Sequence, residues 1–323
     1  MSDVSMQTIH DEIVRAEKRI RPHVRETWLE YSSWLSTGNA SRTVLKLENL
    51  QLTGSFKLRG AANKLLCLKN DEKKHGVVTA SSGNHAAAIA HMLGELGIEG
   101  SIYLPKTASR AKMQKLRAYG TDLKQVGEDC VLAEEAARKE AERSGRVFVS
   151  PYNDLQIIAG QGTVGIELGR RMDRIDAVLV PVGGGGLISG IGAYLKHARP
   201  DIEIIGCQPA NSAVMYESIK AGRILDIPSR PTLSDGTAGG IEAGSVTFDI
   251  CCGIVDDFIL VTEEEISSAL RLLVEKHAML VEGSGALTVA AYLRDAERFR
   301  GKSVILIISG RNIGLDQLKQ ILH

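Results

Sequence analysis

The stretch Ala177-Val-Leu-Val-Pro-Val-Gly-Gly-Gly-Gly-Leu-Ile-Ser-Gly-Ile-Gly192 runs from an apolar strand pattern into four glycines and then into a helix pattern. A turn of this kind presents backbone N–H groups and the positive end of a helix to an anion. Four glycines remove every Cβ that would keep a phosphate from approaching, whereas a tight turn alone needs one or two. The motif predicts a phosphate site. The alternative is that the glycines only permit close packing of helix on strand.

The glycine spacing narrows the kind of phosphate. A dinucleotide site requires G-x-G-x-x-G and an acidic residue at the end of the next strand. No reading frame through the glycines fits this pattern, and the next strand ends in Cys207-Gln208. The pattern of a nucleotide-binding P-loop is also missing, because Gly301-Lys302 lacks the upstream glycine. A compact monophosphate is therefore predicted, and a nucleotide-dependent oxidoreductase is disfavoured.

A second motif, Thr79-Ala-Ser-Ser-Gly-Asn-His85, lies between a predicted strand and a predicted helix. Hydroxyl and amide side chains are concentrated where the first N–H groups of a helix lack partners. Helix capping alone needs only one of them. Ser81, Ser82 and Asn84 around Gly83 are candidates for binding a carboxylate, whereas His85 taken alone is more often structural than catalytic.

A third segment, Leu52-Thr-Gly-Ser-Phe-Lys-Leu-Arg-Gly60, places Lys57 between Phe56 and Leu58 near the start of a helix. Most lysines in such places are surface residues. A lysine that apolar neighbours shield from water has a lowered pKa and can act as a nucleophilic amine. A phosphate site, an activatable lysine and a carboxylate loop are what a pyridoxal-phosphate enzyme requires.

The rest of the chain predicts an α/β protein with parallel strands, because short β-rich runs alternate with helix-period segments from about residue 76. A Gly-, Ser- and Pro-rich segment, 228–246, is expected to be a long functional loop. Thr262 and Glu265 have the spacing of a capping box that opens a helix. The expected strands are 76–80, 101–104, 123–126, 146–149, 177–182, 202–206, 258–261 and 303–308. One expected helix begins near Asn84, and another follows the glycine run and extends to about residue 198. The others cover 109–119, 132–143, 213–221, 263–280 and 284–296.

Composition excludes several classes of protein. Lysine plus arginine equals aspartate plus glutamate at 39 each, so we expect no general attraction to nucleic acid or to a membrane surface. The five cysteines form no C-x-x-C pair and are expected to be free thiols in a reducing compartment. Without a signal-peptide pattern or an apolar stretch of spanning length, a cytoplasmic protein is the expectation.

Together the three motifs, in this order, resemble the fold-type II pyridoxal-phosphate enzymes, and most closely the threonine and serine dehydratases and serine racemase. The likeness covers roughly residues 20 to 320. It implies a tryptophan synthase β-like fold with two three-layer α/β domains and mostly parallel sheets. The large domain would comprise residues 1–66 and 151–323, and the small domain residues 67–150. A homodimer is implied as well.

The resemblance also assigns roles to residues. Lys57 would bind pyridoxal 5'-phosphate as a Schiff base beside Phe56, and Asn84 would contact the ring hydroxyl of the cofactor. The phosphate would lie on Gly183, Gly184, Gly185, Gly186 and Leu187. Ser309 matches the residue that contacts the ring nitrogen. Residues Ser81, Ser82, Gly83, Asn84 and His85 would form the loop that binds the substrate carboxylate.

The implied reaction is loss of water from a β-hydroxy amino acid, such as serine, threonine or 3-hydroxyaspartate, to give a 2-oxo acid and ammonia. Lys57 would take the α-proton. Ser82 would lie on the opposite face and could return a proton, which would make the chain a racemase. A β-replacement synthase is a further alternative, although such enzymes normally show Thr-Ser-Gly-Asn-Thr at the loop, and a non-catalytic cofactor binder is a more remote one.

Two departures from the family pattern bear on ligands. Many relatives bind a divalent cation through a glutamate and an aspartate where this chain has Gln208 and Val214. Neither is a good ligand for a hard cation, so no metal site is predicted there. Relatives often have glycine in place of Arg311, whose guanidinium would either recognise a second carboxylate or point to solvent.

Overall fold

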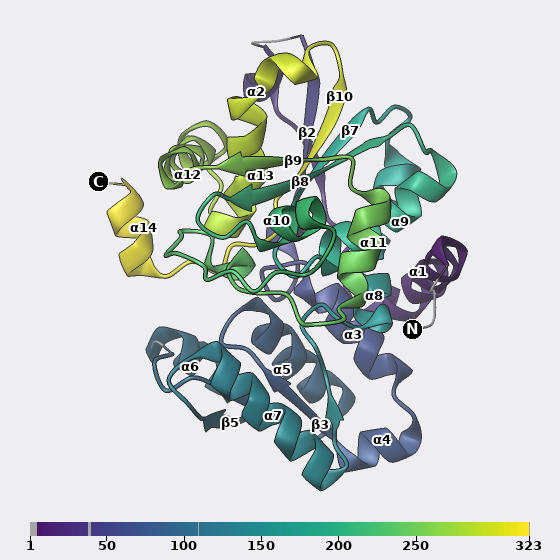
Figure 1. Ribbon diagram of the computed structural model, residues 1–323, viewed down its shortest axis with the longest axis vertical. Helices are drawn as coiled ribbons and strands as arrows, with labels where there is room; N and C mark the ends of the chain where they lie inside the picture. The colour runs from purple at the N-terminus through teal and green to yellow at the C-terminus, as the bar shows by residue number, and fades with distance from the viewer. Residues whose placement is uncertain (1–4, 38–39, 109, 323) are drawn as a thin grey trace.

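The computed structural model describes residues 5–37, 40–108 and 110–322. Ser109, where one helix was expected to begin, and the ends of the predicted large domain, 1–4 and 323, lie outside these residues, as do 38 and 39. Within the described residues the strands form two sheets (Figure 1). The predicted α/β class with mostly parallel sheets is confirmed.

The larger sheet has the strand order β1-β2-β10-β7-β8-β9, and only the edge strand β1 is antiparallel to its neighbour. Along β7, Leu179 packs on one face with the helices that follow β9, whereas Val178 and Val180 pack on the other face with α8 and α9. Burial on both faces explains why these strands are continuous apolar runs. The strands are β1 (Leu29–Tyr31), β2 (Arg42–Lys46), β7 (Ala177–Pro181), β8 (Glu203–Pro209), β9 (Asp257–Val261) and β10 (Ser303–Ile307).

The smaller sheet has the order β5-β4-β3-β6 and is parallel throughout. Ile102 and Leu104 pack against α5 and α6 on one face, and Tyr103 packs against α7 on the other. The sheet and these helices form the lower part of the molecule in Figure 1. The strands are β3 (Val77–Ala80), β4 (Gly100–Leu104), β5 (Asp122–Gln125) and β6 (Val147–Phe148).

The helices occupy both faces of both sheets, which gives each part three layers. Their bounds are α1 (Met6–Ile20), α2 (Ser33–Thr37), α3 (Lys57–Cys67), α4 (Asn70–His75), α5 (Asn84–Leu96), α6 (Arg110–Arg117), α7 (Cys130–Ser144), α8 (Leu155–Arg171), α9 (Gly186–Ala198), α10 (Val214–Ala221), α11 (Val246–Ile254), α12 (Glu263–His277), α13 (Gly283–Arg294) and α14 (Leu315–Leu322). Among the described residues, no helix has the length and apolar character that crossing a membrane requires.

Each expected strand and helix is present, with shifted ends. The capping box of Thr262 and Glu265 opens α12 as predicted, but the helix ends at His277, three residues before the predicted end. Ala278 is the reason, because it adopts a left-handed conformation with φ of 48° and stops the helix. Segment 228–246 is largely irregular, as expected, apart from a short 3-10 turn at Asp235–Thr237.

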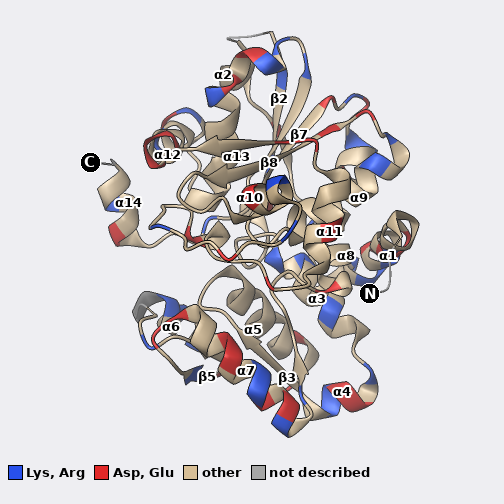
Figure 2. Cartoon of the chain, viewed as in Figure 1, with Lys and Arg blue, Asp and Glu red and all other residues tan. Residues whose placement is uncertain are grey.

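Charged residues of both signs are interspersed along the ribbon of both parts of the molecule, and no region of a single sign stands out in Figure 2. This pattern agrees with the formal net charge of zero. The five cysteines are free thiols, as expected.

Candidate functional site

A narrow cleft lies where β7 and β10 end and α3 begins. Ligands of open parallel sheets bind at this edge, beyond the carboxyl ends of the strands. The cleft brings together two of the three sequence motifs and Ser309. Its lining residues are Phe56, Lys57, Pro151, Tyr152, Gln161, Pro181, Gly183, Gly184, Gly185, Gly186, Leu187, Gly236, Thr237 and Ser309.

Lys57 is the first residue of α3, and its amine lies inside the cleft. The amine Nζ donates a hydrogen bond of 2.8 Å to the carbonyl of Pro151 and lies 5.2 Å from the centre of the Phe56 ring. Burial lowers the pKa of Lys57 to about 8, although the charge of Glu282 acts in the opposite direction. The neutral, nucleophilic form of the amine is therefore much more accessible near neutral pH than in an ordinary lysine.

The glycine loop connects β7 to α9, and all four of its glycines line the cleft. A Cβ on Gly184 would lie 2.4 Å from the ring of Tyr152, and Gly185 has a φ of 86°. Close packing therefore requires glycine at Gly184, and backbone conformation favours it at Gly185. The loop also lines the cleft at the N-terminus of α9. Packing therefore accounts for some of the glycines, and anion binding at this helix end stays a prediction.

Replacement of Gly184 with alanine is expected to destabilise the fold by about 1–3 kcal/mol, because the methyl group must displace the Tyr152 ring. Gly253 in α11 is a matched control, since a Cβ there meets nothing within 4 Å; its alanine variant should gain about 0.5–1 kcal/mol. Chemical denaturation measures both. Equal changes in the free energy of unfolding of the two variants would contradict the packing described around Gly184.

The serine-rich loop follows β3, and Asn84 begins α5. Ser81 Oγ accepts a hydrogen bond of 3.2 Å from the N–H of Gly83. Ser81, Ser82, Gly83 and Asn84 are half-buried. Asn84 Nδ2 donates to Glu282 Oε1 at 2.7 Å, which ties this loop to the segment beside Ser309. The unpaired N–H groups of the first turn of α5 make the loop suited to a carboxylate.

The ring of His85 is engaged away from the loop. It is buried, and its Nε2 lies 3.0 Å from Thr79 Oγ1 and 3.2 Å from the carbonyl of Val149. Burial, helped by the charge of Lys57, lowers the pKa of His85 to about 3, so the ring is neutral at physiological pH. Only the backbone of His85 remains for a role in the loop.

The remaining predicted positions are placed as follows. Ser309 is buried, lines the cleft, and its carbonyl accepts a 3.1 Å hydrogen bond from the N–H of Phe56. Arg311 is half-buried, and its backbone N–H donates a 2.9 Å hydrogen bond to the carbonyl of Gly54. Gln208 Oε1 accepts from the N–H of Tyr216 at 2.9 Å. In the part of the chain that the structure describes, no three His, Cys, Asp or Glu side chains are grouped to hold a metal.

Several cleft residues were not identified from the sequence. Thr237 and Gly236 come from the long loop that was expected to be functional, so a signal existed for them. Tyr152 in the cleft and Glu282 next to it carried no local signal, because long-range packing alone brings them to the site.

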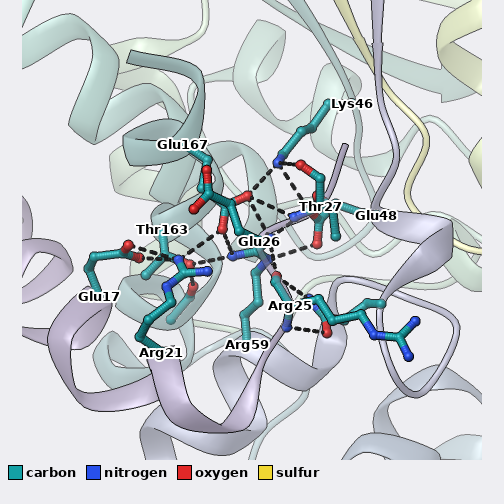
Figure 3. Close-up of polar contacts among 12 residues, drawn as sticks. Glu17, Arg21, Arg25, Glu26, Thr27, Lys46, Glu48, Arg59, Thr163 and Glu167 are labelled. Carbon is teal, nitrogen blue, oxygen red and sulfur yellow. Dashed lines mark hydrogen bonds and ion pairs between the residues drawn. The ribbon is translucent and has the colours of Figure 1, made fainter. Parts of the chain in front are cut away.

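A buried ion cluster surrounds Arg59, which lies in the same helix as Lys57 (Figure 3). Arg59, two residues after Lys57, donates to both Glu48 and Glu167, at 2.8 and 2.7 Å, and Lys46 also bonds to Glu167. These four side chains are fully buried. Arg21 from the end of α1 adds a 2.9 Å contact to Glu167. The cluster joins the N-terminal segment, β2, α3 and α8, and so fixes the start of the helix on which Lys57 lies.

Comparisons with known proteins found similar sequences and similar structures. A family model described as "Pyridoxal-phosphate dependent enzyme" matches residues 20–310. The L-threonine ammonia-lyase of Thermotoga maritima is 41% identical over 98% of this chain and 79% of its own length. The catabolic L-threonine dehydratase of Escherichia coli K12 is 37% identical over 96% of this chain and 95% of its own. The structure of maize serine racemase superposes with a TM-score of 0.91 at 34% identity, covering 96% of this chain and 95% of that one.

Proposed function

Because the chain belongs to the family of pyridoxal-phosphate dependent enzymes, we propose that it is a dehydratase, or ammonia-lyase, of a small β-hydroxy amino acid such as threonine or serine. The observation that carries the proposal is that the shielded Lys57 amine, the glycine loop and Ser309 line one cleft. The similarity to threonine ammonia-lyase over nearly the whole chain supports the reaction type.

The residues of the cleft fit pyridoxal phosphate. The glycine loop offers backbone N–H groups at a helix N-terminus, free of any Cβ, to the phosphate group. Lys57 Nζ would hold the aldehyde carbon covalently beside Phe56. Ser309 would contact the ring nitrogen, and Asn84 the ring hydroxyl. When bound, the cofactor supplies an electron sink that stabilises negative charge on the α-carbon of the substrate.

The chain's own groups would then perform the proton transfers. Lys57 Nζ, with a pKa of about 8, is suited to remove the α-proton and then to protonate the departing β-hydroxyl, which leaves as water. Ser81, Gly83, the backbone N–H of Ser82 and the first N–H groups of α5 would hold the substrate carboxylate, which leaves the Ser82 hydroxyl for proton transfer. Breaking the α C–H and β C–O bonds releases water and an enamine, which hydrolyses to the 2-oxo acid and ammonia.

The test is the release of 2-oxo acid and ammonia by cofactor-loaded protein from L-threonine, L-serine, the 3-hydroxyaspartate isomers and phenylserine. Equal amounts of the two products from threonine or serine are expected. A preference for 3-hydroxyaspartate would assign Arg311 to a second carboxylate. If no member of the panel yields a 2-oxo acid although cofactor is bound, elimination is wrong, and β-replacement with an added thiol is the alternative to assay.

Similarity to maize serine racemase favours racemisation as a second activity. Racemisation needs a proton donor on each face of the α-carbon, and we propose Lys57 and Ser82 for these roles. Replacement of Ser82 with alanine should lower racemisation at least about 100-fold while elimination changes only a few-fold. Chiral chromatography of serine and the oxo acid assay measure the two rates. A parallel loss of both rates would contradict the separate role of Ser82.

We also propose that residues 67–150 form a small domain that closes on the large domain, 1–66 and 151–323, when substrate binds, since Pro151 and Tyr152, at the boundary between the two, line the cleft. A homodimer is proposed as well, because two aromatic residues at the edge strand β1 are exposed: Trp28, just before the strand, at 69%, and Tyr31, its last residue, at 56%. The mass in solution tests the dimer: twice 34.9 kDa is expected.

The free thiols support a cytoplasmic location, which we propose for this protein.

A further inference from the structure

Glu282 carries a buried carboxylate at the boundary between the two sheets. It lies next to the cleft but belongs to none of the sequence motifs. It is 5% exposed and is the N-cap residue of α13. Its backbone N–H donates to the carbonyl of Gly310 at 3.1 Å, and a Cβ on Gly310 would lie 2.4 Å from its Oε1. The carboxylate therefore lies directly against the residue that follows Ser309.

Both carboxylate oxygens of Glu282 are used. Oε1 accepts from Asn84 Nδ2 at 2.7 Å, and Oε2 accepts from the backbone N–H of Asn312 at 3.0 Å. The side chain of Asn312 closes the arrangement, because its Nδ2 donates to Asn84 Oδ1 at 2.5 Å and to the carbonyl of Thr53 at 3.0 Å. Lys115 of α6 also contacts Asn312 Oδ1.

These contacts fix which way the amide of Asn84 faces. An ionised carboxylate only accepts hydrogen bonds, so Nδ2 of Asn84 must face Glu282, and Oδ1 must face the donor Asn312. One hydrogen of Nδ2 remains available for another acceptor. A neutral amide in place of Glu282 could present its own NH₂ group instead, and the preference for this orientation would be lost.

We propose that Glu282 is a positioning residue that orients the Asn84 amide as a hydrogen-bond donor toward the pyridoxal ring and holds the start of α5 against the large sheet. The proposal rests on the proposed binding of the cofactor in this cleft. It adds a residue, 198 positions from Asn84 in the sequence, that acts on the cofactor through another side chain.

The charges around Glu282 make its effect dependent on pH. Burial, and then the charge of Asp235, raise the pKa of Glu282 to about 7, while the hydrogen bonds from Asn84 and Asn312 and the charge of Lys115 lower it. Lys57 is a further positive charge that interacts with Glu282. Below this pKa Glu282 is neutral and resembles glutamine; above it Glu282 is an obligate acceptor. The constraint on Asn84 should therefore strengthen as the pH rises through about 7.

The experiment is a double-mutant cycle read out as the cofactor Kd, measured by equilibrium dialysis, in wild type, Glu282→Gln, Asn84→Ala and the double variant. Glu282→Gln should raise the Kd about 10-fold above pH 7 and much less below it. In the Asn84→Ala background, Glu282→Gln should change the Kd by less than about 2-fold, because the effects of coupled residues are not additive. Glu203→Gln is the matched control, since Glu203 pairs with Arg298 and Lys302 away from the cleft; it should leave the Kd unchanged.

Equal loss of affinity in both backgrounds, or an unchanged Kd in Glu282→Gln, would overturn the proposal. Thermal unfolding of each apoprotein shows whether a variant is folded. If Glu282→Gln is not folded, Asn312→Ala replaces it in the cycle. Asn312→Ala removes the other contact to the Asn84 amide, and its effect on the Kd should be non-additive with that of Asn84→Ala in the same way. The Kd does not depend on which amino acid is the substrate. Failure of this cycle is therefore distinguishable from failure of the dehydratase assay.

Discussion

Replacement of Lys57 with alanine is expected to lower the release of 2-oxo acid by at least about 1000-fold. The variant lacks both the amine that would hold the cofactor and the group that would take the α-proton, and a positioned general base alone contributes about 10²–10⁴ in rate. Lys57 is shielded from water at the start of α3, and this burial lowers its pKa to about 8. The measurement is turnover of L-threonine or L-serine under saturating cofactor.

Lys74→Ala is the control for this variant. Lys74 lies in α4 with its side chain 79% exposed, and its contact to Asp71 is 4.0 Å long. Its activity should match that of the wild type. If Lys57→Ala kept more than about a tenth of the activity with cofactor bound, Lys57 would not be the reacting amine.

Replacement of Glu167 with glutamine is expected to destabilise the protein by about 3–5 kcal/mol, because removal of one partner leaves buried charges uncompensated. Burial acts to raise the pKa of Glu167, but the charges and hydrogen bonds of Arg59 and Lys46 outweigh it and lower the pKa to about 2. Glu167 is therefore ionised in the folded protein, where it faces Arg59, Lys46 and Arg21 (Figure 3). Chemical denaturation near neutral pH measures the change in the free energy of unfolding.

Glu297→Gln is the matched change on the surface. The Glu297–Arg300 pair has a similar distance, 2.6 Å, but its side chains are 75% and 60% exposed, so its loss should cost no more than about 1 kcal/mol. A cost for Glu167→Gln as small as that of Glu297→Gln would contradict the view that the cluster fixes α3. The depressed pKa also predicts that the contribution of Glu167 is present above about pH 4.5 and is lost as the pH falls toward 2.

Local motifs made much of the site predictable. The run of glycines after an apolar strand identified the phosphate loop candidate, because strand, turn and helix are consecutive there and β7 leads directly into α9. Lys57 was expected near a helix start and is the first residue of α3. The alternation of strands and helices predicted the parallel sheets for the same reason: each signal lies within a few neighbouring residues.

The features that the sequence did not predict arise from contacts between segments that are distant in the chain. Tyr152, whose ring excludes any side chain at Gly184, and Glu282, which meets Asn84 across the two sheets, have ordinary sequence surroundings. The ion cluster is equally hidden, since Lys46, Arg59 and Glu167 are typical surface residue types and only the packing of β2, α3 and α8 buries them. The first 75 residues were likewise left without assigned strands, although β1 and β2 belong to the larger sheet.

The most direct test of Lys57 as the reacting amine is to reduce the cofactor-loaded protein with borohydride and map the modified peptide by mass spectrometry. The pyridoxyl group is expected on the peptide that contains Lys57, with no modification of Lys46, Lys64 or Lys115. Modification of another lysine, with Lys57 unmodified, would contradict the proposed site and the chemistry assigned to it.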